Sequence, residues 1–173
     1  YIESLNPDGW WPFDDNYTDM SGNGNNGTGY GANISFIPIK YENGSNIDGI
    51  GDYMIVQNSS SLQIQNNVSF SFIVNSTTLE RGVFISNNVG SSPLILIRIE
   101  SSDGYVRAQF TSANAQYVGG IPVDIGLTTG LHNIFITYSN GTRKIYLDNV
   151  LKDSSTNSNM DSMKLGTDFN IGR

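Results

Sequence analysis

Few residues of this chain belong to the types that carry out catalysis. The 173 residues include four glutamates, Glu3, Glu42, Glu80 and Glu100, and none has a second carboxylate two positions away. A retaining glycosidase needs two carboxyl groups about 5 Å apart, which alternate strand positions would supply. His132 is the only histidine and cysteine is absent, so the chain offers no cysteine–histidine pair and no zinc cluster. We therefore expect no enzyme activity and a structural role for His132.

Oxygen-bearing side chains gather in the stretch that precedes the first predicted sheet. Asp14, Asp15, Asp19, Asn23 and Asn25 lie in a Gly-rich segment, and calcium prefers hard oxygen ligands of this kind. Their spacing is not that of an EF-hand loop. Two interpretations stay open: a calcium site formed by Asp14, Asp19, Asn23 and Asn25, or a tight turn in which these side chains bond the local backbone. We favour the turn, and we expect that no cofactor is required.

Three aromatic side chains could form the exposed platform that sugar binding needs. Trp10 falls on the outward face of a predicted strand, Tyr41 stands two residues before Asn43, and Tyr117 lies in the predicted loop 112–120. Each could instead lie at a rim or in the core of the fold. These three residues are the candidate carbohydrate-binding residues of the sequence.

Asparagine is abundant, and it often stands in the triplet Asn-x-Ser/Thr that accepts N-linked glycans. The chain has 21 asparagines and eight such triplets, where chance placement would give roughly four. A glycan-coated extracellular surface would explain the excess, and so would Asn-rich loops that create triplets by accident. The candidate glycosylation sites are Asn16, Asn26, Asn33, Asn43, Asn58, Asn67, Asn75 and Asn140.

The charge and the apolar pattern exclude several classes of partner. The net charge is −7 and the nine lysines and arginines are scattered, which argues against nucleic acid and against anionic membranes. No apolar run approaches the length of a transmembrane helix, so we expect no membrane insertion. The chain begins at Tyr1, which indicates a processed or truncated N-terminus. The glycosylation triplets favour an extracellular location, on a cell surface, a surface filament or a virion.

The clearest secondary structure lies in residues 130–153, GLHNIFITYSNGTRKIYLDNVLKD. Apolar and polar residues alternate over 132–139 and again over 143–147, as in strands with one buried face. The dipeptides Asn140-Gly141 and Asp148-Asn149 supply residues that tolerate the positive φ of tight turns. We predict three short antiparallel strands joined by two turns. In the first strand one face would carry His132, Ile134, Ile136 and Tyr138, and the other Asn133, Phe135, Thr137 and Ser139. In the second strand Ile145 and Leu147 would point one way, and Lys144 and Tyr146 the other.

Other short runs between turn residues are also predicted strands, and no window supports a long helix. In the first run we expect Trp11 and Phe13 to face inward and Trp10 to face outward. A chain of this length without disulfides is expected to fold as a single domain over residues 1–173. The strands predicted from these runs are 10–14, 82–86, 94–99 and 105–110.

Several of these stretches resemble the laminin-G-like domains of the concanavalin A-like lectin/glucanase superfamily. WPFDD at 11–15 with DMSGNGNNGT at 19–28 is similar to the start of such a domain. Residues 51–62 resemble its G-x-x-D-Y-V-x-V … S-L strand, and residues 68–73 resemble the strand that usually follows. The hairpin 130–150 resembles the W-H-H-x-x-x-T-Y … L-Y-V-D-G pattern, and 165–173 the I-G-G/R strand. The resemblance implies an all-β, antiparallel two-sheet β-sandwich, a jelly roll of concanavalin A type. It also implies ligand recognition by loops at one rim or by one sheet face.

The chain departs from the family pattern at three points. Leu131 stands where the family has tryptophan, and Asn149 stands where it has glycine, which is tolerable because asparagine also adopts positive φ. The family continues into one more strand, whereas the chain as given stops at Arg173. Either the given sequence omits that segment, or another segment or a neighbouring subunit supplies the strand at an open sheet edge.

Two classes of function follow from these observations. The first is a non-catalytic extracellular recognition or adhesion module, with lectin-like carbohydrate binding within a larger cell-surface or viral attachment protein. Its partner would be a glycan or a glycoprotein. The alternative is a structural subunit or decoration domain of an extracellular filament, coat or virion, in which neighbouring subunits assemble by strand addition.

Overall fold

The computed structural model describes residues 6–31, 35–39, 43–47, 51–63, 66–89, 92–100, 103–160, 162–163 and 167–172. The chain divides into two compact units, the first made of residues 1–63 with 167–173 and the second of residues 64–166. That the whole chain forms one domain stays a prediction. Among the described residues no helix has the length and apolar character needed to cross a bilayer.

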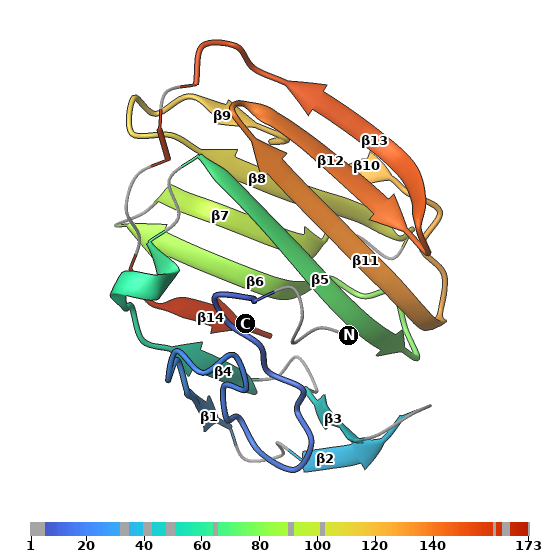
Figure 1. The fold of residues 1–173 in the computed structure, drawn as a ribbon. Coiled ribbons are helices and arrows are strands. Elements are labelled where there is room, and N and C mark those ends of the chain that lie inside the picture. Colours follow the sequence, from blue (N-terminus) through green and yellow to red (C-terminus); the bar gives the residue numbers. More distant parts are fainter. Residues whose placement is uncertain are drawn as a thin grey trace. The chain divides into compact units, whose positions relative to one another are not determined.

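The first unit contains a small antiparallel sheet and a separate two-stranded hairpin (Figure 1). In the sheet β4 is flanked by β1 and β14, and Val56 of β4 lies opposite Gly27 on one side and Phe169 on the other. Met54 and Val56 of β4 are fully buried. The strands are β1 (Gly27–Tyr30), β4 (Tyr53–Val56) and β14 (Phe169–Ile171), with the hairpin β2 (Ser35–Pro38) and β3 (Asn43–Asn46), and a 3₁₀ turn covers Ser60–Leu62.

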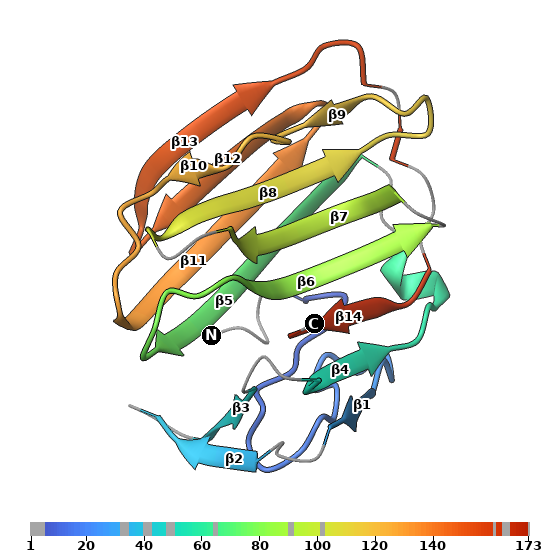
Figure 2. The same ribbon diagram turned by 180° about the vertical axis from the view of Figure 1, so that it is seen from behind.

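The second unit contains two antiparallel layers, which Figure 1 shows from one side and Figure 2 from the other. One layer has the order β6-β7-β8-β10, with β9 also paired to β8. The other has the order β13-β12-β11-β5. The first layer comprises β6 (Gly82–Val89), β7 (Ser92–Ile99), β8 (Tyr105–Thr111), β9 (Tyr117–Val118) and β10 (Val123–Asp124). The second comprises β5 (Asn67–Ser76), β11 (Gly130–Ser139), β12 (Thr142–Leu147) and β13 (Val150–Thr156).

Aromatic rings join the two layers of the second unit. Phe72 of β5 stacks on Phe84 of β6 with ring centres 5.6 Å apart, and Phe110 of β8 stacks on Tyr138 of β11 at 4.9 Å. Such pairs add about 1 kcal/mol to the burial of their apolar area. Because the contacts run from layer to layer, the two sheets enclose a shared core. The predicted all-β, antiparallel two-sheet sandwich is thus confirmed.

The meander at residues 130–153 is confirmed as predicted. Asn140 and Gly141 both have positive φ, as do Asp148 and Asn149, which is what two-residue type I′ turns require. The Cβ of any other residue at position 141 would collide with the carbonyl oxygen of Asn157. Glycine is therefore needed at this turn for close approach as well as for its backbone freedom.

The predicted strand at residues 10–14 is wrong. Residues 10–13 lie in a loop and are half-buried, so Trp10 does not face outward from a strand. Phe13 and Asp15 adopt positive φ, which interrupts any extended run. The apolar composition of the segment reflects packing instead: the indole N–H of Trp11 donates to the carbonyl oxygen of Asn25 at 2.8 Å.

The predicted strand near the C-terminus is present as β14, and it pairs with β4 along its described length. Strand addition by a neighbouring subunit near this strand stays a prediction.

Candidate functional site

The three aromatic candidates from the sequence lie in different environments. Trp10 is half-buried in the first unit, where its backbone N–H donates to Asp19 Oδ1 at 2.9 Å. Tyr117 is on β9 of the second unit with 57% of its surface exposed, and its carbonyl oxygen accepts a hydrogen bond from Asn157 Nδ2. Tyr41 falls outside the described residues. Of the two that the structure describes, Tyr117 has the exposure that a sugar platform needs.

The acidic turn of the first unit is organised around the Asp19 carboxylate, which is 7% exposed. Oδ1 accepts from the backbone N–H groups of Trp10 and Ser21, both at 2.9 Å. Oδ2 accepts from the Ser21 hydroxyl at 2.8 Å and from the Asn25 N–H at 2.9 Å. Burial raises the pKa of Asp19, but these hydrogen bonds outweigh it and hold the pKa below its ordinary value. The carboxylate therefore ties three separate backbone segments together.

Asn25 is fixed in the same turn by its own side chain. Its Nδ2 donates to the carbonyl oxygen of Asp8 at 2.8 Å, and its Oδ1 accepts from the Ser59 hydroxyl at 2.6 Å. Asn23 and Asp14 are exposed. The oxygens that calcium would need on Asp19 and Asn25 thus accept protein hydrogen bonds, which fits the tight turn of the two interpretations. Calcium binding stays a prediction.

The asparagines of the glycosylation triplets lie mostly on the surface. Asn43 is half-buried, and its Nδ2, the atom that would carry a glycan, donates to Asp15 Oδ1 at 2.7 Å. Asn33 falls outside the described residues. Glycan attachment at any of the eight triplets stays a prediction. The exposed members are Asn16, Asn26, Asn58, Asn67, Asn75 and Asn140.

His132 has the structural surroundings that the sequence predicts. Its Nδ1 lies 2.8 Å from Asp148 Oδ2, and its Nε2 lies 3.0 Å from the Thr128 hydroxyl. Asp148 Oδ1 also accepts the backbone N–H of Asn133 at 2.9 Å, and this bond and the one from His132 lower the pKa of Asp148. The group ties the start of β11 to the turn between β12 and β13.

The face of the β5-β11-β12-β13 layer that points away from the core has its own pattern of side chains. Thr137 lies opposite Lys144 across the β11–β12 pair, and Ser139 lies opposite Thr142. Tyr146 lies opposite Phe135. These residues alternate with the buried ones on the same strands, so the strands that build the core also present this second surface.

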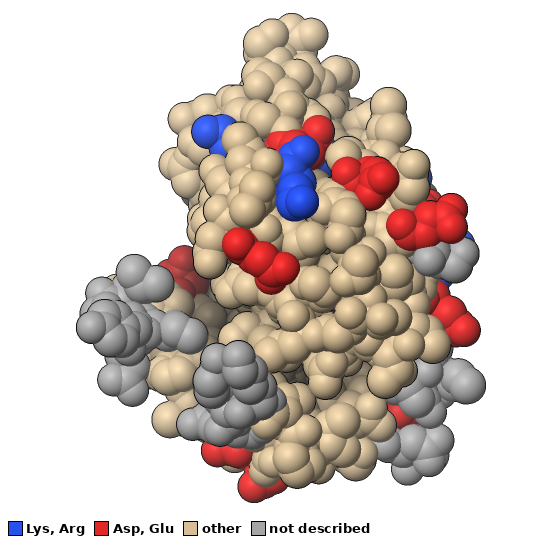
Figure 3. Space-filling view, turned by 90° about the vertical axis from the view of Figure 1, so that its right-hand side faces the viewer, with Lys and Arg blue, Asp and Glu red and all other residues tan. Residues whose placement is uncertain are grey.

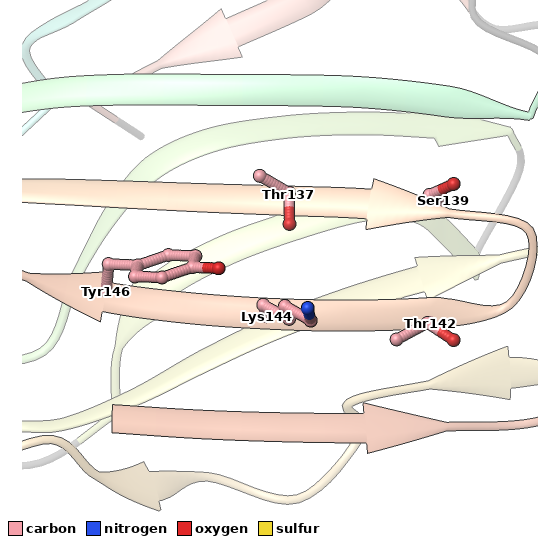
Figure 4. A pocket seen from close by; sticks show the side chains of 5 residues that line it. All are labelled: Thr137, Ser139, Thr142, Lys144 and Tyr146. Atoms are coloured by element: carbon pink, nitrogen blue, oxygen red, sulfur yellow. The ribbon is translucent and has the colours of Figure 1, made fainter. Parts of the chain in front are cut away.

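Five of these side chains line a shallow hollow of about 340 Å³: Thr137, Ser139, Thr142, Lys144 and Tyr146. Figure 4 shows the Thr137 hydroxyl pointing from β11 toward β12, and the Tyr146 hydroxyl pointing along β12 toward Lys144. The hollow is comparable in volume with the smaller ligand sites of proteins. We call it the β11–β12 hollow.

The hydroxyls at one end of the β11–β12 hollow are already ordered by their neighbours. The Ser139 hydroxyl donates to Asn67 Oδ1 at 2.7 Å, and the Thr142 and Thr156 hydroxyls lie 3.1 Å apart. A hydroxyl held in this way still has a lone pair to offer to a ligand. The hollow therefore presents polar groups in fixed positions.

The other end of the β11–β12 hollow is bordered by apolar side chains. The Phe135 and Tyr146 rings lie 5.8 Å apart in a tilted arrangement, and Phe135 is 37% exposed. Leu151, which lies opposite Tyr146 on β13, is 50% exposed. The surface thus combines an aromatic platform with hydroxyl groups, as sugar-binding surfaces do, because sugars carry apolar C–H faces as well as hydroxyls.

Lys144 is the only charged residue among the five that line the β11–β12 hollow. It is exposed, and it makes no ion pair with another described residue. The surrounding protein is acidic, with a net charge of −7. Figure 3 shows acidic side chains spread over one side of the molecule and only sparse basic ones. Lys144 is thus one of the few cations of an acidic protein.

The sequence pattern groups Thr137 with Ser139 on one face of the first strand and Lys144 with Tyr146 on one face of the second. It does not assign Thr142, and it did not predict a site there. The individual residues look like those of an ordinary solvated strand face. The signal that was available is the combination of an aromatic residue, Tyr146, with hydroxyl residues on the neighbouring strand at matching positions.

No protein-family model matches the chain, and no curated protein matches it by sequence. Solved structures do resemble it. The binding domain of Paraclostridial Mosquitocidal Protein 1 superposes with a TM-score of 0.73 at 15% identity, covering 94% of this chain and 42% of that one. The Botulinum neurotoxin serotype D binding domain gives a TM-score of 0.68 at 25% identity, covering 90% and 40%.

A third similar structure is the Botulinum neurotoxin serotype D ligand binding domain in complex with N-acetylneuraminic acid. It gives a TM-score of 0.68 at 24% identity, and the match covers 90% of this chain and 39% of that one. The chain therefore spans less than half the length of these binding domains. Its β-rich fold resembles part of the fold of these neighbours, which are binding domains rather than catalytic ones.

Proposed function

We propose that the chain is a non-catalytic carbohydrate-recognition module that binds a glycan or glycoprotein through the β11–β12 hollow. The observation that carries the proposal is the hollow itself, with the Tyr146 ring at one end and the hydroxyls of Thr137, Ser139 and Thr142 along it. A sugar ring can lay its C–H face on an aromatic side chain while its hydroxyls bond to neighbouring oxygens.

The structural neighbours support the class of function that we propose. They are binding domains of toxins, and one of them holds N-acetylneuraminic acid, a sugar. Since the matched part is 39% of that chain, the likeness supports a class of function and not the position of a ligand.

The same proposal places the chain among the laminin-G-like domains, as an adhesion or recognition unit of a larger extracellular protein. The support is the β11–β12–β13 meander, which carries the family-like hairpin pattern. The exposed asparagines of the glycosylation triplets support the extracellular setting, because N-glycans are attached to surface asparagines of secreted proteins.

Glycan-array binding followed by titration tests the proposal. We expect the chain to bind oligosaccharides with dissociation constants in the high micromolar to millimolar range, about −4 to −5 kcal/mol. Tyr146→Ala should abolish detectable binding because it removes the aromatic platform. Tyr105→Ala removes an exposed tyrosine of β8, 38% exposed, and should leave binding unchanged.

Trp10 and Tyr117, two aromatic candidates from the sequence, offer an alternative location for the sugar site. If Tyr117→Ala or Trp10→Ala abolishes binding while Tyr146→Ala does not, the sugar site lies elsewhere and the β11–β12 hollow is not the site. If the folded chain binds no glycan on the array, carbohydrate recognition itself is excluded for the sugars displayed.

A further inference from the structure

We infer that the β11–β12 hollow selects sugars that carry an anionic substituent, a carboxylate or a sulfate, and that Lys144 is the group that binds it. This inference rests on the proposed function, because it concerns the ligand class of the same hollow. Hydroxyl groups and an aromatic ring alone would bind neutral sugars, whereas Lys144 would make the hollow prefer negatively charged ones.

The position of Lys144 is the first support. The residue lies in the middle of β12, between Thr142 and Tyr146, which line the same hollow on either side of it. Thr137 faces it across the strand pair. A ligand seated on Tyr146 and bonded to Thr137 would bring its substituents within reach of the Lys144 ammonium, which has three donors and a flexible stem.

The absence of a competing carboxylate is the second support. No Asp or Glu is among the five residues that line the hollow. Elsewhere in the described residues, Arg98, Arg107 and Arg143 form ion pairs with Glu100 or Asp153. Lys144 forms none of these pairs, so its charge is available to a ligand.

The third support is that the protein is acidic as a whole, so that a preference for anionic sugars must come from a nearby cation. A protein of net charge −7 repels anions at long range. Within a Debye length of about 10 Å at ordinary ionic strength, however, one nearby cation dominates the field that a bound group experiences. Selectivity for an anionic sugar is therefore expected to depend on this one residue.

Isothermal titration with three trisaccharide or disaccharide probes tests the inference. Lactose is neutral, 3′-sialyllactose adds a carboxylate-bearing sugar, and 3′-sulfolactose adds a sulfate to the same disaccharide. We expect either or both of the anionic probes to bind about fivefold more tightly than lactose, the gain of one solvent-exposed charge pair. The preference should shrink as sodium chloride is raised from 20 to 500 mM, conditions that shorten the Debye length.

Two variants with the same change in net charge separate Lys144 from the protein as a whole. Lys144→Gln should remove the preference, so that the variant binds the anionic probes no more tightly than it binds lactose. Lys152→Gln is the matched control, since Lys152 is an exposed lysine of the neighbouring strand β13 that does not line the hollow. It should retain the preference.

Each result decides a different question. Preference for one anionic probe alone identifies carboxylate or sulfate as the group recognised. Equal binding of lactose and both anionic probes, or equal losses in Lys144→Gln and Lys152→Gln, overturns the inference and leaves the proposed function standing. Failure of the wild-type chain to bind any of the three probes, together with a blank glycan array, overturns both.

Discussion

The two faces of the β5-β11-β12-β13 layer are built from alternate residues of the same strands, yet they have opposite characters. The inward face carries Ile134, Ile136 and Ile145, all fully buried. The outward face carries hydroxyls, aromatic rings and Lys144. One set of backbone hydrogen bonds thus holds both a core and the candidate binding surface, and side chains on the two faces should affect different properties.

The two cations of β12, Arg143 and Lys144, differ in the same way between the inward and outward faces. Arg143 on the inward face is fully buried, and its guanidinium bonds to Asp153, to Ser155 Oγ at 2.8 Å and to the carbonyl oxygen of Ala108 on the other layer at 3.3 Å. Its neighbour Lys144 on the outward face makes no ion pair with a described residue. The two adjacent cations of β12 thus have separate roles: Arg143 joins the two sheets, and Lys144 is available to a ligand.

The largest expected effect comes from shortening an inward side chain. Ile136→Ala removes a fully buried side chain and should lower the free energy of unfolding by about 3 kcal/mol through lost burial and a residual cavity. The adjacent outward change Thr137→Val keeps a β-branched residue and should alter it by less than about 0.5 kcal/mol. Urea denaturation measures both. Similar losses in the two variants would contradict the division between the faces.

The next effect concerns the two cations. Arg143→Met leaves Asp153 without its partner and should cost about 2 kcal/mol, less than for a fully buried pair because water reaches Asp153. Lys144→Met should change stability by less than about 0.5 kcal/mol. Thermal or urea unfolding of both variants provides the measurement. If Arg143→Met proves as stable as the wild type, the buried guanidinium does not join the sheets energetically.

A smaller effect is expected from acid. The hydrogen bonds from the Asn133 N–H and from His132 lower the pKa of Asp148, so ionised Asp148 stabilises the folded state above the ordinary pKa of an aspartate, near 4. This contribution is lost as the pH falls through the lowered pKa. We therefore expect Asp148→Asn to reduce stability at pH 6 and to approach the wild type at pH 3.

Urea unfolding at a series of pH values between 6 and 3 tests this expectation. Asp103→Asn serves as the control, because Asp103 is an exposed carboxylate in the turn before β8. A difference between wild type and Asp148→Asn that is constant over the whole pH range would show that the carboxylate charge plays no part in the tie between β11 and the following turn.

The smallest effect is expected at the acidic turn of the first unit. There the Asp19 carboxylate is hydrogen-bonded within the protein, as the Arg143 guanidinium is in the second unit. Because four protein donors already bond the Asp19 carboxylate, we expect chelator to leave the melting temperature unchanged, and added calcium to do the same. A rise of several degrees with calcium that chelator reverses would instead establish the calcium site that the sequence also allows.

Much of the fold could be predicted because local signals and tertiary packing agree. In β8 the alternation of Tyr105 to Phe110 indicates a core face of Val106, Ala108 and Phe110, and all three are fully buried. In the meander, period-two alternation and two turn dipeptides define strands, faces and register without reference to the rest of the chain.

The failures arise where distant residues decide the local structure. The strand predicted at 10–14 is a loop because Phe13 adopts positive φ and Asp19 bonds the Trp10 backbone, which no local pattern reveals. The β11–β12 hollow was missed although its strand pair was predicted, because hydroxyl residues, a lysine and a tyrosine at these positions look like an ordinary solvated strand face. Arg143 shares the inward side of β12 with Ile145 by alternation, but a buried cation is rare enough that the pattern alone does not indicate its role.

The two type I′ turns of the meander also bear on how the chain reaches its structure. Contacts between β11 and β12, and between β12 and β13, join residues that are close in sequence, so closing these loops costs little entropy. The pairing of β11 with β5 joins residues about sixty apart, such as Ile136 with Phe70. The meander is therefore expected to form early in folding, with β5 docking onto β11 in a later step that limits the rate.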